Sequence, residues 1–171
     1  KTSGPMPRYI VGPPAHFNAD SIGYNADVLK KLPNQVGWPE LLNKKWKAKV
    51  PLLKVPDIVM QDVGNALKAQ GIFKPKDMGN MTPAEIDRVV KIATTYKKAG
   101  QFRAFWKDFN ESVNLMSSGE VVIQSMWSPA VTKVRSMGVA CVYQPLKEGY
   151  RAWAAGFGLP RTLKGKKLDA A

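Results

Sequence analysis

Two tryptophans stand near the ends of predicted strands, where an aromatic ring could bind a small molecule. Trp127 follows Val121–Met126, an apolar run of strand length. Ser128-Pro129 then predicts a new helix, with Ser128 as its N-cap and Pro129 at its first position. Open α/β sheets bind ligands outside the carboxyl ends of their strands, so Trp127 is a candidate binding residue. The alternative is that Trp127 belongs to the core.

The second tryptophan, Trp153, lies in a strand-like segment, residues 150–160, that contains two glycines and ends at Pro160. The indole rings of Trp127 and Trp153 could pack against an alkyl chain or a planar group. They would also attract a cationic ligand through a cation–π interaction. Both are therefore candidate ligand-binding residues, with two core tryptophans as the alternative.

Polar candidates lie close to the predicted helix starts. Asp57 and Gln61 belong to the predicted helix 56–70, Ser128 opens the next one, and Asp20 lies just before the predicted strand 21–25. The free backbone N–H groups of a helix start favour an anionic or carboxylate-bearing ligand. Asp57 could instead only complement its helix dipole, and Asp20 could be an ordinary turn residue.

The chemistry of an enzyme is not apparent in the chain. It has one histidine, His16, and one cysteine, Cys141, so neither a Ser-His-Asp set nor a Cys/His metal site can be assembled. A Gly-rich phosphate loop and a carboxylate pair are also missing. Cys141 lies in an apolar run and is predicted to be a buried strand thiol. We expect no catalytic residue, no metal and no cofactor.

The chain of 171 residues is strongly basic, with 26 Lys and Arg against 13 Asp and Glu, a net charge of +13. Such a charge can indicate nucleic acid, an anionic membrane or an acidic partner. The lysines occur in scattered pairs, mostly at predicted helix ends. This placement indicates a role in solubility and in complementing helix dipoles rather than in nucleic-acid binding. No apolar run approaches the ~20 residues of a membrane span.

Strands and helices alternate along the chain, which predicts an α/β fold. Strands are expected at 21–25, 50–54, 121–126, 139–143 and 151–159, with a short one near 8–11. Helices are expected at 26–32, 38–45, 56–70, 82–99, 110–116 and 129–137. Thr82 and Glu85 match a capping box at the start of one helix.

The order of these motifs resembles the second lobe of type II periplasmic solute-binding proteins of ABC transporters, in the spermidine/putrescine-binding branch. The resemblance runs from Phe17 to Ala171. It rests on the strand 21–25, a Trp-x-Glu-Leu-Leu motif at 38–42, a Lys-x-Lys-Val strand at 47–53, the helix 56–70, the Gly-Glu-Val strand at 119–126 and the strand around Trp153.

The resemblance implies an α/β, three-layer lobe with a mostly parallel mixed sheet flanked by helices. It divides the chain into a connector (1–16), a solute-binding lobe with hinge strands (17–160), and the start of a return segment to a missing first lobe (161–171). The whole protein would be periplasmic, would hold a small solute in a cleft between two lobes, and would have an ABC permease as its partner. An isolated lobe with Trp127 and Trp153 exposed could dimerise.

In this family, the two tryptophans contact the ligand, and carboxylates bind the amines. The carboxylates come from the first turn of the helix after the Lys-x-Lys-Val strand and from two residues beyond the second tryptophan. Here these positions hold Ile58, Gln61 and Ala155. The ligand is therefore expected to be an amine- or carboxylate-bearing solute, and spermidine binding is expected to be weak. A basic nucleic-acid-binding module and a two-lobed enzyme of the same fold remain the alternatives.

Overall fold

The computed structural model describes residues 14–31, 35–143 and 146–156. The chain forms two compact units. One is Asp20–Arg151, and the other is made from the two ends of the chain, Lys1–Ala19 and Ala152–Ala171. The predicted strand at 8–11 and the predicted return segment lie outside the described residues, so the predicted domain boundaries stay predictions.

Six strands are present among the described residues: β1 (Pro14–Asn25), β2 (Val50–Leu53), β3 (Phe102–Trp106), β4 (Ile123–Met126), β5 (Cys141–Tyr143) and β6 (Arg151–Gly156). β1 runs antiparallel to both β4 and β5, so β4 and β5 are parallel to each other. β2 and β3 are parallel, and β6 pairs with β1. The backbone N–H of Val122 donates to the carbonyl of Lys49 at 2.9 Å, which joins the segments that lead into β4 and β2. The predicted α/β fold is confirmed, and its described strands pair in two sheets, one of four strands around β1 and one of β2 and β3.

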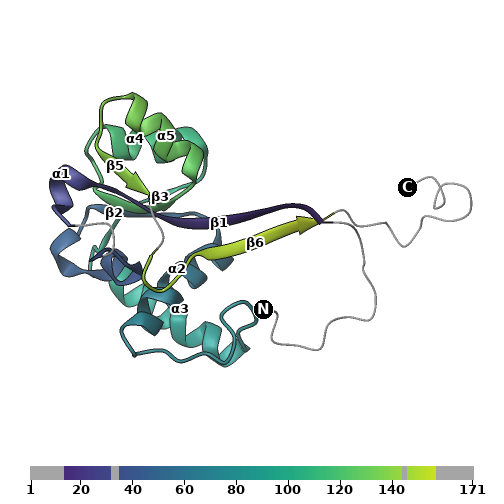
Figure 1. Ribbon diagram of the computed structural model, residues 1–171. Coiled ribbons are helices and arrows are strands. Elements are labelled where there is room, and N and C mark those ends of the chain that lie inside the picture. The colour runs from purple at the N-terminus through teal and green to yellow at the C-terminus, as the bar shows by residue number, and fades with distance from the viewer. Residues whose placement is uncertain (1–13, 32–34, 144–145, 157–171) are drawn as a thin grey trace, which may run out of the picture. The chain divides into compact units, whose positions relative to one another are not determined.

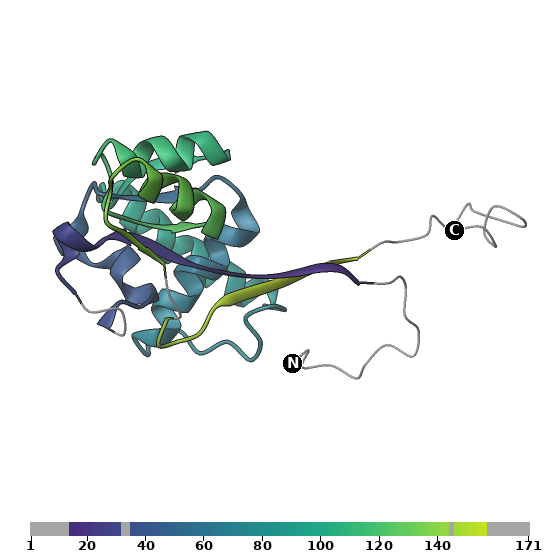
Figure 2. The same ribbon diagram turned by 45° about the horizontal axis from the view of Figure 1, so that its top comes forward.

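Helices cover both faces of the strands in the unit Asp20–Arg151 (Figure 1). α2 (Pro56–Ala69) and α3 (Pro83–Lys98) lie on one face, and α4 (Phe109–Ser117) and α5 (Ser128–Ser136) lie on the other, as the turned view also shows (Figure 2). A short helix, α1 (Ala26–Leu29), follows β1 directly. The predicted three layers are therefore present in this unit.

Each face has its own apolar core. The cluster on the α2 and α3 side includes Ile22 and Tyr24 of β1 together with Val63 and Leu67 of α2. The cluster on the α4 and α5 side includes Val113, Met116, Val131 and Val134, and reaches the ends of β2, β3 and β4. Alternate residues of the strands are thus buried on opposite sides, as expected for a sheet between two helical layers.

The predicted helix 38–45 is wrong. The segment forms two 3₁₀ turns, η2 (Trp38–Leu42) and η3 (Lys44–Trp46). They are separated at Asn43, whose backbone is extended (φ −70°, ψ 120°) and whose side chain accepts a hydrogen bond from the Lys45 N–H. An asparagine that caps the next turn competes with a continuous helix, which explains the break.

The capping box at α3 is confirmed. The Thr82 hydroxyl accepts from the Glu85 N–H at 3.3 Å, and the Glu85 carboxylate accepts from the Thr82 N–H at 2.7 Å. The predicted N-cap at Ser128 is wrong, because Trp127 is the N-cap of α5 and Ser128 is its first residue. α5 therefore starts one residue earlier than the proline suggested.

Candidate functional site

The carboxyl ends of three strands meet in one apolar cluster. Leu53, Trp106 and Met126 are the last residues of β2, β3 and β4, and all three are buried in the cluster on the α4 and α5 side. Ile58, in the first turn of α2, and Trp127 pack against the same cluster. Trp127 and the first turn of α2 thus border the same apolar cluster. Most of the predicted polar binding residues lie in the segments that follow.

Trp127 is half-buried, with its ring edge-on to that of Trp106. The ring centroids are 5.0 Å apart and the planes cross at 87°. This is a favourable aromatic geometry that holds the indole in one orientation. Trp127 is therefore only partly in the core: its ring packs against Trp106, and a minor part of the residue is exposed.

Neither helix start at this edge has a side-chain cap. Val55 is the N-cap of α2 and Trp127 that of α5, and neither side chain can accept a hydrogen bond from the first turn. The predicted site residues Asp57 and Ser128 are exposed here, and Gln61 is half-buried one turn further along α2. Uncapped N–H groups together with the positive end of the helix dipole can bind an anionic group.

Asp20 is not a turn residue. It lies in β1, is 1% exposed, and its Oδ2 is 3.2 Å from Nη1 of Arg151, the first residue of β6. Nε of the same arginine donates to Oδ1 of Asp62 at 2.9 Å. One buried guanidinium thus contacts two buried carboxylates, from β1 and α2.

Asp62 is the charged residue that the sequence interpretation missed. It is fully buried, and burial raises its pKa above the usual aspartate range, although the positive charge of Arg151 and the nearby Ser125 hydroxyl oppose this rise. The negative charge of Asp20 adds to the rise. The second oxygen, Oδ2, has no hydrogen bond within the part of the chain that the structure describes. The sequence did indicate that Asp62 is buried, because it lies four residues after Ile58, on the apolar stripe of α2.

The buried cluster affects the predicted site because it engages Asp20. A carboxylate that is buried against Arg151 is not available to a solute at the surface. The hydroxyl of Tyr143 beside it accepts from the Ser21 N–H at 2.9 Å, and burial raises the pKa of this tyrosine to about 12. Among the predicted acidic binding residues, Asp57 is therefore the exposed one.

Trp153 belongs to the unit made from the chain ends. It is 38% exposed, and its ring is edge-on to that of His16 in β1, with centroids 4.9 Å apart. Ala155, at the position where the resemblance implies a carboxylate, is half-buried in β6. The joint action of Trp153 and Trp127 on one ligand stays a prediction from the sequence.

Cys141 is a buried strand thiol, as predicted. It is 2% exposed in β5, and burial raises its pKa to about 11 despite the nearby Arg135. Across residues 14–31, 35–143 and 146–156, no three His, Cys, Asp or Glu side chains gather in a way that could hold a metal ion.

Residues 10–171 match the family described as bacterial extracellular solute-binding protein, and the chain belongs to this family. No curated protein matches the chain. Within the described residues, the helices are too short or too polar to span a lipid bilayer.

Solved structures share the fold at low sequence identity. The spermidine/putrescine ABC transporter substrate-binding protein PotD from Streptococcus pneumoniae matches at 18% identity and a TM-score of 0.64, over 94% of this chain and 45% of that one. The TpPotD lipoprotein of Treponema pallidum matches at 15% and 0.66, over 95% and 48%. The Atu4243–GABA receptor matches at 22% and 0.59, over 78% and 39%. The chain spans less than half the length of each of these proteins.

Proposed function

We propose that this chain is the second lobe of the periplasmic solute-binding component of an ABC importer. The solute would bind in a cleft between this lobe and another lobe, and an ABC permease in the membrane would receive it. The observation that carries the proposal is that a half-buried Trp127 and two uncapped helix starts lie at the carboxyl ends of β2, β3 and β4. This is the edge at which open α/β sheets bind ligands.

The charge of the site favours a solute with a carboxylate or a single amine. Asp57 offers one exposed carboxylate, while Asp20 is buried against Arg151. The other positions at which the resemblance to polyamine receptors implies carboxylates hold Ile58, Gln61 and Ala155. Each further ammonium of a bound polyamine would lose its hydration without a carboxylate from this lobe, which costs several kcal/mol.

The names of the similar proteins cover both kinds of ligand. Two name spermidine/putrescine transport or PotD, and one names GABA, which has one amine and one carboxylate. The free N–H groups at the starts of α2 and α5 could bind a carboxylate, and Asp57 and the Trp127 face could bind one ammonium. We therefore place the ligand in the amino-acid-like class rather than among the polyamines.

Calorimetry on the intact receptor tests this proposal. The panel consists of spermidine, putrescine, GABA, α-amino acids and simple carboxylates. We expect the tightest binding from a solute with one carboxylate and at most one amine. Sub-micromolar binding of spermidine would contradict the assignment of the ligand class. If no small solute of the panel binds, the proposal that the protein is a solute receptor is wrong.

The alternatives of the sequence interpretation have separate tests. A nucleic-acid-binding module would be retained on DNA and released steeply by salt. An enzyme of this fold would turn over one of the panel solutes instead of returning it unchanged.

A further inference from the structure

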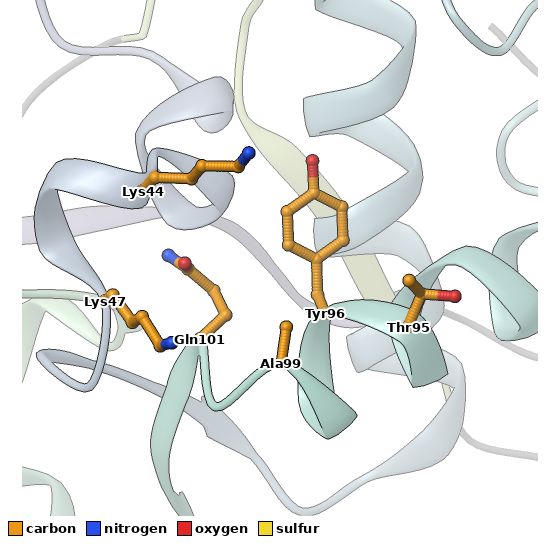
Figure 3. A pocket seen from close by; sticks show the side chains of 6 residues that line it. All are labelled: Lys44, Lys47, Thr95, Tyr96, Ala99 and Gln101. Carbon is orange, nitrogen blue, oxygen red and sulfur yellow. The ribbon is translucent and has the colours of Figure 1, made fainter.

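A pocket opens at the opposite edge of the parallel strands β2 and β3. It has a volume of about 540 Å³ and is lined by Lys44, Lys47, Thr95, Tyr96, Ala99 and Gln101 (Figure 3). Lys47 precedes β2, and Gln101 immediately precedes β3, so the pocket lies at the amino ends of these strands. Asp57 and Gln61 follow the carboxyl end of β2. A ligand in this pocket is therefore separated from the predicted solute site by the length of a strand, roughly 13 Å for four residues.

The pocket walls are held by backbone and side-chain hydrogen bonds. The Gln101 amide donates from Nε2 to the carbonyls of Leu41 at 3.2 Å and Asn43 at 3.1 Å, which ties η2 and η3 to the start of β3. The Ala48 N–H donates to the Gln101 carbonyl at 3.0 Å. Because Gln101 is 2% exposed and both amide hydrogens are engaged, its side chain has a fixed orientation.

The end of α3 forms the other wall. The carbonyls of Thr95, Tyr96 and Lys97 accept from the N–H groups of residues 99, 101 and 100 at 3.0 Å each. The negative end of the helix dipole opposes an anion at this wall, so the ammonium groups of the lining lysines must outweigh it. The side chains of Tyr96, from α3, and Lys44, from η3, face the same opening, and the Gln101 amide points toward the η3 side (Figure 3). Tyr96 and Ala99 supply apolar surface beside these polar groups.

The charge of the pocket is positive. Two of the six lining residues are lysines and none is a carboxylate. Neither lysine forms an ion pair in the described part of the chain. Lys45, next to Lys44 in η3, adds a further ammonium group, which lies over the Trp46 ring at 4.7 Å. Part of the +13 charge, which a solute cleft does not explain, is thus concentrated around a cavity.

We propose that this pocket binds a small anion with an apolar body, such as an aromatic or branched carboxylate or phosphate ester. The volume is within the range of about 300–1,000 Å³ that small-molecule sites occupy. The two ammonium groups would pair with the anionic group, and the Tyr96 ring would pack against the body. The Gln101 Oε1 atom would select a hydroxyl or amine on the ligand, since its Nε2 is already engaged. This site is independent of the solute that the receptor transports.

Ligand-observed NMR and calorimetry on the intact protein test the site with benzoate as the probe. Benzamide is the neutral analogue, and acetate is the anion without the apolar body. We expect benzoate to bind saturably, and both analogues to bind at least about tenfold more weakly. The combined change Lys44→Glu and Lys47→Glu should raise the Kd of benzoate by at least about tenfold. The control, Lys68→Glu with Lys133→Glu, makes the same change in net charge at exposed positions elsewhere and should leave the Kd unchanged.

Three outcomes would overturn the proposal: no saturable binding of benzoate, equal binding of benzoate and benzamide, or equal effects of the two double variants. Binding of the protein to anionic vesicles through Lys44 and Lys47, without binding of benzoate, would also overturn it in favour of a membrane surface. Binding of the transported solute should be the same in both double variants, so a failure here is distinguishable from a failure of the receptor proposal.

Discussion

Nε of Arg151 donates to Oδ1 of Asp62 at 2.9 Å, across 89 positions of the sequence. The same guanidinium contacts Asp20, so a single side chain joins the start of β6 to β1 and α2. All three side chains are almost completely buried. Because a buried charge without its partner is costly, this cluster strongly constrains the place where the two strands meet the helical layer.

Arg151→Met should destabilise the unit by about 3–5 kcal/mol, because it leaves two buried carboxylates without a counter-charge. Urea unfolding, followed by circular dichroism, measures the change. Arg103→Met is the matched control, since its pair with Glu120 at 2.8 Å is exposed, and such pairs contribute at most about 1 kcal/mol. Equal losses in the two variants would show that the buried cluster has no special role.

Asp62→Asn should remove a pH dependence of stability. The pKa of Asp62 is higher in the folded than in the unfolded state, chiefly because of burial. The folded state therefore retains a proton that the unfolded state has released, and stability falls as the pH rises from the usual aspartate range through the raised pKa. Above that pKa the contribution is constant.

The measurement is the free energy of unfolding against pH for the original chain and the variant. The difference between them should shrink or reverse as the pH rises through this window. Asp87→Asn, an exposed change on α3, is the control. A difference that does not vary with pH would contradict the raised pKa.

Thr82→Ala should destabilise the unit by about 1 kcal/mol, since the hydroxyl accepts from the Glu85 N–H at the start of α3. Thr94→Ala, at an exposed position inside the same helix, should be neutral or slightly stabilising because alanine has the higher helix propensity. Thermal unfolding of both variants compares the two. A loss of equal size in each would mean that the cap is not the cause.

Trp127→Ala in the intact receptor should weaken solute binding by about 2 kcal/mol, as for aromatic anchors in pockets. Stability should fall by less than the roughly 3–5 kcal/mol of a fully buried tryptophan, because Trp127 is only half-buried against Trp106. The control Met137→Ala removes an exposed apolar side chain at the other end of α5. A full core-sized loss of stability with unchanged affinity would assign Trp127 to the core.

Cys141 should not react with a thiol reagent at pH 8 while the protein is folded. Its thiol is 2% exposed, and burial raises its pKa to about 11, so little thiolate is present or accessible. Denaturant should expose one reactive thiol per chain, since the sequence has one cysteine. Rapid labelling of the native protein would contradict the burial of β5.

Local sequence patterns predicted the elements well wherever each pattern had a local physical cause. The helix 56–70 begins at a proline, and the start of α3 is encoded by Thr82 and Glu85, which satisfy each other's backbone groups. The segment 38–45 was predicted wrongly because Asn43 caps the following 3₁₀ turn, a competition that apolar spacing does not show. Ser128 was predicted as a cap because its residue type fits, but the backbone of Trp127 occupies that position.

The sequence by itself determined the α/β class and the family-like order of motifs, because these depend on periodicity and short-range capping. It also determined that Trp127 follows a buried strand. Only the tertiary structure decided the state of Asp20, because its partner Arg151 lies at the other end of the chain and Asp62 on a helix between them. The sequence had predicted Asp20 as a carboxylate that binds the solute. In the fold it is buried and paired with Arg151, because a charge removed from water must be paired within the protein.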